Sequence, residues 1–338
     1  MTALPGHLPF YPLMDGPTPL QEMARLRQTL LSEVKSCPRL FIKRDDLTGL
    51  AGGGNKTRKL QYLVADALEQ GADTLVTAGA LQSNHVRQTA AAAAKAGLNA
   101  HVILFDMVDY AEPAYHASGN ILLDRILGAN IHRPAKEADP RDVFDAVIAQ
   151  ITQEGGKAYI VPVGGSNAVG STAYAEAYLE MLEQSKGMGL DLTRITHATG
   201  SLGTQAGLLA GRALSGAALP IKAISVARPT RDALAGELLE IANQTATRIG
   251  APNVQDSDIH VDFRHLGDGY GLPTSAMVSA VELVARAEGI LLDPVYSGKG
   301  MAGLIAQILS GEIDPDETVI FLHTGGMPGL FAYAEMFK

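Results

Sequence analysis

The chain has 338 residues and a formal net charge of −9, and 46% of its residues are hydrophobic and 19% charged. This balance is typical of a globular protein with a sizeable core, and the length allows two domains or one α/β domain with an insertion. Lys/Arg-rich runs, apolar stretches of roughly 18 residues and zinc-type His/Cys spacing are all absent, so we expect no nucleic-acid partner, no membrane span and no metal.

Short apolar runs alternate with helical stretches along almost the whole chain, which predicts an α/β fold of βαβ units with mostly parallel sheets. The expected strands are 40–44, 74–79, 100–105, 157–165, 194–200, 221–228 and 318–326. Glycine-rich turns occur at 52–54, 164–165, 200–203 and 325–326. If the first two turns are hinges, residues 54–164 form a small inserted domain within a large domain of residues 1–53 and 165–338. Because ligands bind at the carboxyl ends of such strands, we expect these turns to converge on one cleft.

The first candidate residue, Lys56, follows three glycines in "GGGNKTRK" (52–59). The stretch is not a P-loop, because Asn55 separates the glycine from the lysine. Lys56 begins a helix on whose apolar stripe it lies, while Arg58 is expected to point away from that stripe. A desolvated lysine suits Schiff-base chemistry with a carbonyl cofactor. The alternative is a lysine that reaches the surface or pairs with Asp45 or Asp46.

Two further segments place helix N-termini where anions could bind. In "ATGSLGTQAGLLAG" (198–211) a strand ends at Thr199 and a helix begins near Thr204, which suits a phosphate but lacks the dinucleotide spacing. In "AGALQSNHVRQTAAAAAKAG" (78–97) Ser83 or Asn84 caps a helix whose first turn, beside His85, suits a small carboxylate. The alternatives are a plain strand-to-helix turn and an ordinary cap with a surface histidine.

Four polar side chains stand near the end of the chain. Thr324 ends a strand in "HTGG", Tyr296 and Ser297 precede a helix in "LDPVYSGKGMAGL", and Tyr270 lies in "GDGYGLP". Tyrosine in a turn usually serves packing. Together with the buried lysine and the two anion sites, however, these groups match what pyridoxal phosphate and a bound amino acid require.

Six motifs in order carry a resemblance to a known family: "GGNKTRKL", "TAGALQSNHVRQTAAAAAKAG", "VPVGGSN", "TGSLGTQAG", "LLDPVYSGK" and "HTGG". From about Pro17 to Tyr333 the chain resembles the D-cysteine desulfhydrase and 1-aminocyclopropane-1-carboxylate (ACC) deaminase family. This resemblance implies pyridoxal 5'-phosphate as cofactor and the tryptophan-synthase-β-like fold, or fold type II. That fold has two open, twisted, mostly parallel sheets flanked by helices.

The resemblance also implies a role for each candidate residue. Lys56 carries the cofactor covalently and acts as the base, while Ser83, Asn84 and His85 bind the substrate. Asn84 also faces the cofactor ring, and Tyr270 and Tyr296 line the substrate side as catalytic candidates together with Ser83. The remaining cofactor-binding candidates are Thr199, Gly200, Ser201, Leu202, Gly203 and Thr204 around the phosphate, and Ser297 and Thr324 near the pyridine nitrogen.

Ser297 departs from the ACC deaminases, which typically have glutamate at this position. A hydroxyl stabilises a protonated ring less well than a carboxylate does, so Ser297 favours α,β-elimination over opening of a cyclopropane. We therefore expect conversion of D-cysteine to pyruvate, ammonia and hydrogen sulfide by a carbon-sulfur lyase. The alternatives are ACC deaminase, L-cysteate sulfo-lyase and elimination from another small D-amino acid. For the second of these, the sequence shows no cation placed for a sulfonate. Leu202 also departs from relatives that have a small residue, which puts the shape of that turn in question.

The remaining expectations concern the state of the protein and the classes outside this family. The family usually forms homodimers, and Cys37, the only cysteine, suits a reducing cytoplasm. Prolines interrupt the N-terminal segment, which lacks the apolar stretch of a signal peptide, so we expect a cytoplasmic protein. A cofactor-free binding protein with two lobes and a phosphate-binding NTP enzyme share the α/β pattern but not the ordered motifs.

Overall fold

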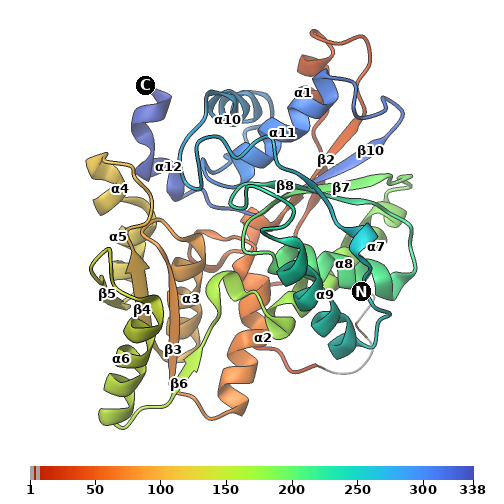
Figure 1. Ribbon diagram of the computed structural model, residues 1–338. Helices are drawn as coiled ribbons and strands as arrows, with labels where there is room; N and C mark the ends of the chain where they lie inside the picture. Colours follow the sequence, from red (N-terminus) through yellow and green to blue (C-terminus); the bar gives the residue numbers. More distant parts are fainter. Residues whose placement is uncertain (1–3, 5–7) are drawn as a thin grey trace.

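The computed structural model describes Leu4 and residues 8–338, and within this part of the chain the strands form two separate sheets (Figure 1). The larger sheet has the order β1 (Leu20–Glu22), β2 (Arg39–Arg44), β10 (Thr318–His323), β7 (Arg194–Thr199), β8 (Ile221–Ser225) and β9 (His260–Asp262). The smaller has the order β5 (Asn130–His132), β4 (Asn99–Phe105), β3 (Thr74–Ala80) and β6 (Ala158–Ile160). Apart from the antiparallel β1–β2 pair, the strand pairs described are parallel.

Helices pack on both sheets, as the alternation of strands and helices predicts. Those that pack on the larger sheet are α1 (Ala24–Leu30), α7 (Ala168–Gly187), α8 (Gly203–Ser215), α9 (Ala235–Ile249), α10 (Ser275–Glu288) and α11 (Ser297–Leu309). Those around the smaller sheet are α2 (Lys56–Glu69), α3 (Asn84–Ala96), α4 (Pro113–Ala117), α5 (Gly119–Ile126) and α6 (Pro140–Gln153). Near the C-terminus, α12 (Gly329–Ala332) lies against α4 and α5. Among the described residues no helix is long and apolar enough to cross a membrane.

Two adjacent inner strands of the larger sheet, β2 and β10, supply side chains to a core on each face. Phe41 of β2 and Ile320 of β10 are partners in register and pack with α7, α8 and α9. The next pair along, Ile42 and Phe321, belongs to the core formed with α1, α10 and α11. Successive side chains of a strand point to opposite faces, so a strand buried on both faces reads as a continuous apolar run. This is why the sequence reveals these strands clearly.

The seven strands expected from the sequence are all present, which confirms the α/β fold with two mostly parallel sheets. The strand expected at 157–165 is too long, because β6 ends at Ile160 and residues 163–165 form a 3₁₀ turn after Pro162. Three further strands, β1, β5 and β9, have no signal in the sequence, since three residues are too few to show an alternation.

The smaller sheet is built from residues 74–160, and the larger sheet is built from segments on either side of it in the sequence. On this ground we keep as a proposal that residues 54–164 form a small domain inserted into a large domain of residues 1–53 and 165–338.

Candidate active site

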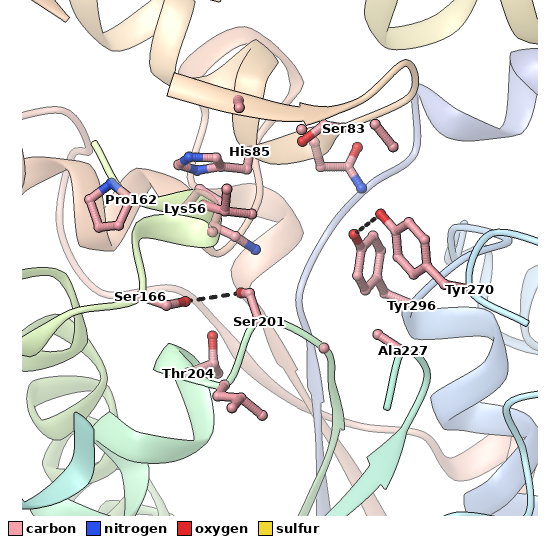
Figure 2. A pocket seen from close by; sticks show the side chains of 18 of the residues that line it. Lys56, Ser83, His85, Pro162, Ser166, Ser201, Thr204, Ala227, Tyr270 and Tyr296 are labelled. Atoms are coloured by element: carbon pink, nitrogen blue, oxygen red, sulfur yellow. Dashed lines mark hydrogen bonds between the residues drawn. The ribbon is translucent and has the colours of Figure 1, made fainter. Parts of the chain in front are cut away.

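A cavity of about 570 Å³ lies where the carboxyl ends of strands from both sheets meet, and Figure 2 shows side chains that line it. This is the place where open α/β sheets bind ligands. The site residues predicted from the sequence that line it are Lys56, Ser83, Asn84, His85, Thr199, Gly200, Ser201, Leu202, Thr204, Tyr270, Tyr296 and Thr324. Two predicted residues, Gly203 and Ser297, do not line it. Of the expected glycine-rich turns, 164–165 and 200–203 contribute residues to the lining, whereas 52–54 and 325–326 do not and are each adjacent to a lining residue, Asn55 and Thr324.

Lys56 is the first residue of α2, and its side chain reaches the cavity (Figure 2). Its Nζ donates a hydrogen bond to Asn55 Oδ1 at 2.8 Å, and Asn55 Nδ2 donates to Thr204 Oγ1 at 3.0 Å. Burial lowers the pKa of Lys56 to about 8; the Asp293 carboxylate opposes this shift and Arg87 adds to it. A substantial fraction of the Lys56 amine is thus neutral near pH 8, as a nucleophile or base requires.

The expectation that Arg58 points away from the buried face is wrong, because Arg58 is only 5% exposed. Its guanidinium forms two hydrogen bonds with Asp45, both 3.0 Å, and two with Glu180, both 2.9 Å. Arg58 therefore occupies the Asp45 carboxylate that the alternative reading assigned to Lys56. Lys43 completes this buried cluster through its own ion pair with Glu180.

The turn after β7 leads into the N-terminus of α8 and forms a cradle on the cavity wall. Leu202 has φ +70° and ψ −30°, a sparsely populated conformation that costs a non-glycine residue about 1–3 kcal/mol. Ser166 Oγ donates to Ser201 Oγ at 3.0 Å, which leaves the Ser201 proton free (Figure 2). A Cβ on Gly164 would lie 2.0 Å from Ser201 Oγ, so the 163–165 turn can approach only with glycine at this position.

Three groups in and behind this cradle fit a phosphate. The first turn of α8 supplies backbone N–H groups without intrahelical partners. Thr199 Oγ1 is buried and has no hydrogen-bond partner in the described part of the chain. Lys59 is fully buried behind Gly203 and donates to Gly164 O at 2.9 Å, but it forms none of the ion pairs found among the described residues. An anion at this position would accept hydrogen bonds from the α8 N–H groups and from Thr199 Oγ1, with Lys59 behind them, so the residues present fit the phosphate of pyridoxal phosphate.

On the opposite side of the cavity, α3 begins at Asn84 with Ser83 as its cap. Ser83 Oγ accepts a hydrogen bond from Val86 N at 3.3 Å, so its own proton remains free to donate. A Cβ on Gly79 would lie 2.5 Å from Ser83 Oγ, so the close approach of β3 to the cap needs glycine. The free N–H groups of the first turn and the Ser83 hydroxyl together suit a carboxylate.

His85 is a neutral ring rather than a cation. Thr77 Oγ1 donates its one proton to Val161 O at 2.8 Å, and so it accepts from His85 Nε2 at 2.8 Å. Burial and the nearby Lys56 hold the pKa of His85 well below its usual value. The Nδ1 atom is then an acceptor, without a partner in the described part of the chain. Because its lone pair would repel a carboxylate, we propose that Ser83 and the α3 N-terminus bind the carboxylate instead.

Asn84 is held in one orientation by neighbours behind the cavity. Its Oδ1 accepts hydrogen bonds from Arg87 Nη1 at 3.1 Å and from Asn120 Nδ2 at 2.9 Å. The Nδ2 atom consequently faces the other way, toward Gly326, whose added Cβ would lie 2.7 Å from it. Asn84 therefore presents a donor, and this donor would suit an oxygen of the cofactor ring, as the resemblance implies.

Tyr270 and Tyr296 come from two separate turns, and their hydroxyls lie 2.5 Å apart (Figure 2). Burial is the main cause that raises the pKa of both, that of Tyr296 well above its usual value. Both hydroxyls are therefore protonated at neutral pH. Only one proton is needed for the hydrogen bond between them, so the pair has a second proton available to the cavity.

Ser297 lies behind the cavity wall. Its Oγ donates to Asp293 Oδ1 at 2.7 Å and accepts from Asp293 N at 2.8 Å. Asp293 is itself buried and also accepts from the backbone N–H groups of residues 295, 296 and 297. Thr324, in contrast, lines the cavity. The contact of Ser297 with the cofactor therefore stays a prediction, and a carboxylate stands directly behind this serine.

Several residues of the site have no role in the sequence-based prediction: Asn55, Lys59, Arg87, Asp293 and Arg228. Lys59 follows Lys56 by three residues, and this helical spacing alone places both on one side of α2. Asn55, Arg87 and Asp293 are each hydrogen-bonded to a predicted site residue within four positions in the sequence, but their residue types alone do not indicate a role.

Comparison with known proteins identifies the class. Residues 12–325 match the family model of pyridoxal-phosphate dependent enzymes, and the chain belongs to that family. The cofactor is therefore pyridoxal phosphate, and the two sheets are those of the tryptophan-synthase-β-like fold, fold type II.

Within this family the relatives are more specific. The chain is 40% identical to the D-cysteine desulfhydrase of Serratia proteamaculans (strain 568) over 328 residues, 97% of each chain. It is 41% identical to the D-cysteine desulfhydrase of Klebsiella pneumoniae (strain 342), over 95% of each chain. It also matches a crystal structure of an ACC deaminase homologue with a TM-score of 0.85 and 32% identity, over 98% of this chain and 95% of that one.

Proposed function

We propose that this enzyme is a carbon-sulfur lyase that converts D-cysteine to pyruvate, ammonia and hydrogen sulfide by α,β-elimination. The observation that carries the proposal is the 40% identity, over 97% of the chain, to a protein named D-cysteine desulfhydrase. The residues of the cavity supply each function that this reaction requires. When bound at Lys56, the cofactor withdraws electrons from the substrate Cα.

Lys56 is the base in this proposal. The Nζ atom lies in the cavity and its pKa is lowered to about 8, so the amine is able to take the proton from the substrate Cα. A positioned base of this kind typically contributes about 10²–10⁴-fold to the rate. Asn55 holds Nζ and connects it to the phosphate turn through Thr204, so that the base and the cofactor-binding turn keep a fixed relation.

The substrate carboxylate binds at the N-terminus of α3 through the Ser83 hydroxyl and backbone N–H groups. The Tyr270–Tyr296 pair protonates the leaving sulfur, because it holds a second proton that the hydrogen bond between the rings does not need. The carboxylate and the sulfur thus contact different walls of the cavity. This arrangement orients Cα toward Lys56.

The two alternative activities are less well supported. Opening the ring of ACC depends more than α,β-elimination does on stabilisation of the protonated pyridine ring. The chain has Ser297 where ACC deaminases typically have glutamate. L-Cysteate elimination needs a cation for the sulfonate. The cavity does contain a guanidinium, that of Arg228, but Glu237 pairs with it at 2.7 Å.

A homodimer in the cytoplasm completes the proposal. The dimer is supported by the resemblance to the family, and the cytoplasmic location by Cys37, the only cysteine, which is buried and unpaired. Light scattering on a size-exclusion column tests the first, since a mass near that of one 35.5 kDa chain would contradict it.

The experiment that tests the activity combines a visible spectrum with product assays. The purified protein receives D-cysteine, L-cysteine, L-cysteate and ACC in turn, and pyruvate, 2-oxobutyrate, sulfide and sulfite are measured. We expect pyruvate and sulfide from D-cysteine, and loss of turnover in Lys56→Ala but not in Lys186→Ala, a control at an exposed lysine. Preference for another substrate, or full activity of Lys56→Ala, would contradict the proposal.

A further inference from the structure

The more exposed residues of the cavity lining form its mouth, and the two walls of this mouth differ in chemistry. One wall, from the end of β4 and the start of α6, is apolar and consists of Phe105, Met107, Pro140 and Phe144. The other wall consists of Ala227, Arg228 and Glu237. This second wall adjoins the leaving-group side. A Cβ on Gly200 would contact both Tyr296, at 3.3 Å, and Ala227, at 3.6 Å, and Figure 2 shows Ala227 below the tyrosine pair.

Arg228 and Glu237 are the charged groups of this mouth. Among the described residues that line the cavity, Arg228 and Lys56 are the only lysine or arginine side chains, and Glu237 is the only carboxylate. Arg228 Nη2 donates to Glu237 Oε2 at 2.7 Å, and the two side chains are 36% and 51% exposed. The neighbouring Arg231 pairs elsewhere, with Asp256.

The guanidinium of Arg228 is positioned independently of Glu237. Its Nη1 donates to Ala233 O at 3.0 Å, and the backbone of Arg228 is held by Ser225 Oγ, which accepts from its N–H at 3.2 Å and donates to its carbonyl oxygen. Removing the Glu237 charge would therefore leave a cation in the same place, facing the cavity without a counter-charge.

We infer that Glu237 determines which leaving groups the enzyme accepts, by neutralising Arg228 at the mouth of the cavity. The inference rests on the proposed function. A neutral thiol suits an apolar wall opposite a neutralised ion pair. An anionic β-substituent, such as the sulfonate of cysteate, is repelled by Glu237 and finds Arg228 already paired. Specificity of this kind comes from a repulsive group as much as from an attractive one.

The test is Glu237→Gln, which keeps the size of the side chain and its ability to accept a hydrogen bond but removes the charge. L-Cysteate and D-cysteate are each tested as inhibitors of D-cysteine turnover, and their inhibition constants are measured. Elimination from cysteate itself is assayed in parallel. We expect the inhibition constant to fall about five- to tenfold for at least one enantiomer. This is the effect expected when the unpaired charge of Arg228 lies near a partly exposed sulfonate. Turnover of D-cysteine should change by less than about twofold, because its neutral thiol interacts only weakly with the charge of Glu237.

Two controls identify the source of the effect. Glu240→Gln removes an exposed carboxylate of the same helix that does not line the cavity, and it should leave the inhibition constant unchanged. Arg228→Gln combined with Glu237→Gln should abolish the gain. An inhibition constant unchanged in Glu237→Gln, or lowered equally in the double variant, would overturn the inference.

Failure of the proposed function gives a different result. If the wild-type enzyme does not turn over D-cysteine, the proposed function is wrong. The affinity for cysteate can then be read from the change in visible absorbance of the bound cofactor. The effect of the Glu237 charge is thus measured in either case.

Discussion

The buried cluster around Arg58 allows a quantitative prediction of stability. Replacing Arg58 by methionine keeps most of the aliphatic volume but removes four hydrogen bonds to Asp45 and Glu180. Asp45 is fully buried, and its carboxylate would be left without its principal partner. Removing one member of a buried ion pair typically costs about 3–5 kcal/mol, because the other charge stays desolvated. We expect the free energy of unfolding to fall by about that amount.

The pH dependence separates this cause from a simple loss of packing. Burial raises the pKa of Asp45, but Arg58 and Lys43 outweigh burial and hold the pKa below its usual value. In the wild type this stabilisation is complete above the unfolded pKa of about 3.9 and is lost as the pH falls through the folded pKa. In Arg58→Met the effect of burial on the pKa of Asp45 dominates, so protonation of Asp45 reduces the loss of stability of the variant. The deficit relative to wild type should therefore be largest near neutral pH and shrink in acid.

Urea unfolding followed by circular dichroism between pH 4.5 and 7.5 measures both effects. The matched control is Arg264→Met, since Arg264 also binds two carboxylates but is 58% exposed, and its loss should cost less than about 1 kcal/mol. A cost for Arg58→Met as small as that of the control, or one that does not change with pH, would refute the reasoning.

Three further predictions concern the cavity. The apoenzyme should bind pyridoxal phosphate covalently at a rate that rises with pH and is half-maximal near pH 8, because the pKa of Lys56 is lowered to about 8; half-maximal rate near 10.5 would contradict this. Tyr270→Phe and Tyr296→Phe should each retain part of the elimination activity, since either hydroxyl has a proton to give. The double variant should lose about 10²–10⁴-fold in kcat, and a double variant as active as the singles would rule out the pair as the acid. Asn55→Ala should raise the Kd for the cofactor about five- to tenfold, because a buried hydrogen-bonded side chain is lost. An unchanged Kd in equilibrium dialysis would contradict a role in cofactor binding for the bridge that Asn55 forms between Lys56 and Thr204.

Much of the fold follows from local sequence patterns. The strands buried on both faces, such as β2 and β10, are continuous apolar runs, and their alternation with amphipathic stretches predicts two mostly parallel sheets. The short strands β1, β5 and β9 do not follow in this way, because their pairing is decided by neighbours distant in the sequence. Arg58 shows the same limit. Its position on α2 predicts a solvated side chain, whereas Asp45 and Glu180 provide the partners that allow it to be buried.

The sequence by itself determined the chemical types of the site. Lys56 after a glycine turn, the hydroxyl-rich turn before α8 and the cap of α3 are local features, and local hydrogen bonding and helix geometry are sufficient to make them recognisable. Only the tertiary structure decided their states. The tautomer of His85 depends on Thr77, the orientation of Asn84 on Arg87, and the lowered pKa of Lys56 on burial between two sheets. Protonation and orientation result from desolvation and from contacts between distant segments, and neither is present until the chain has folded.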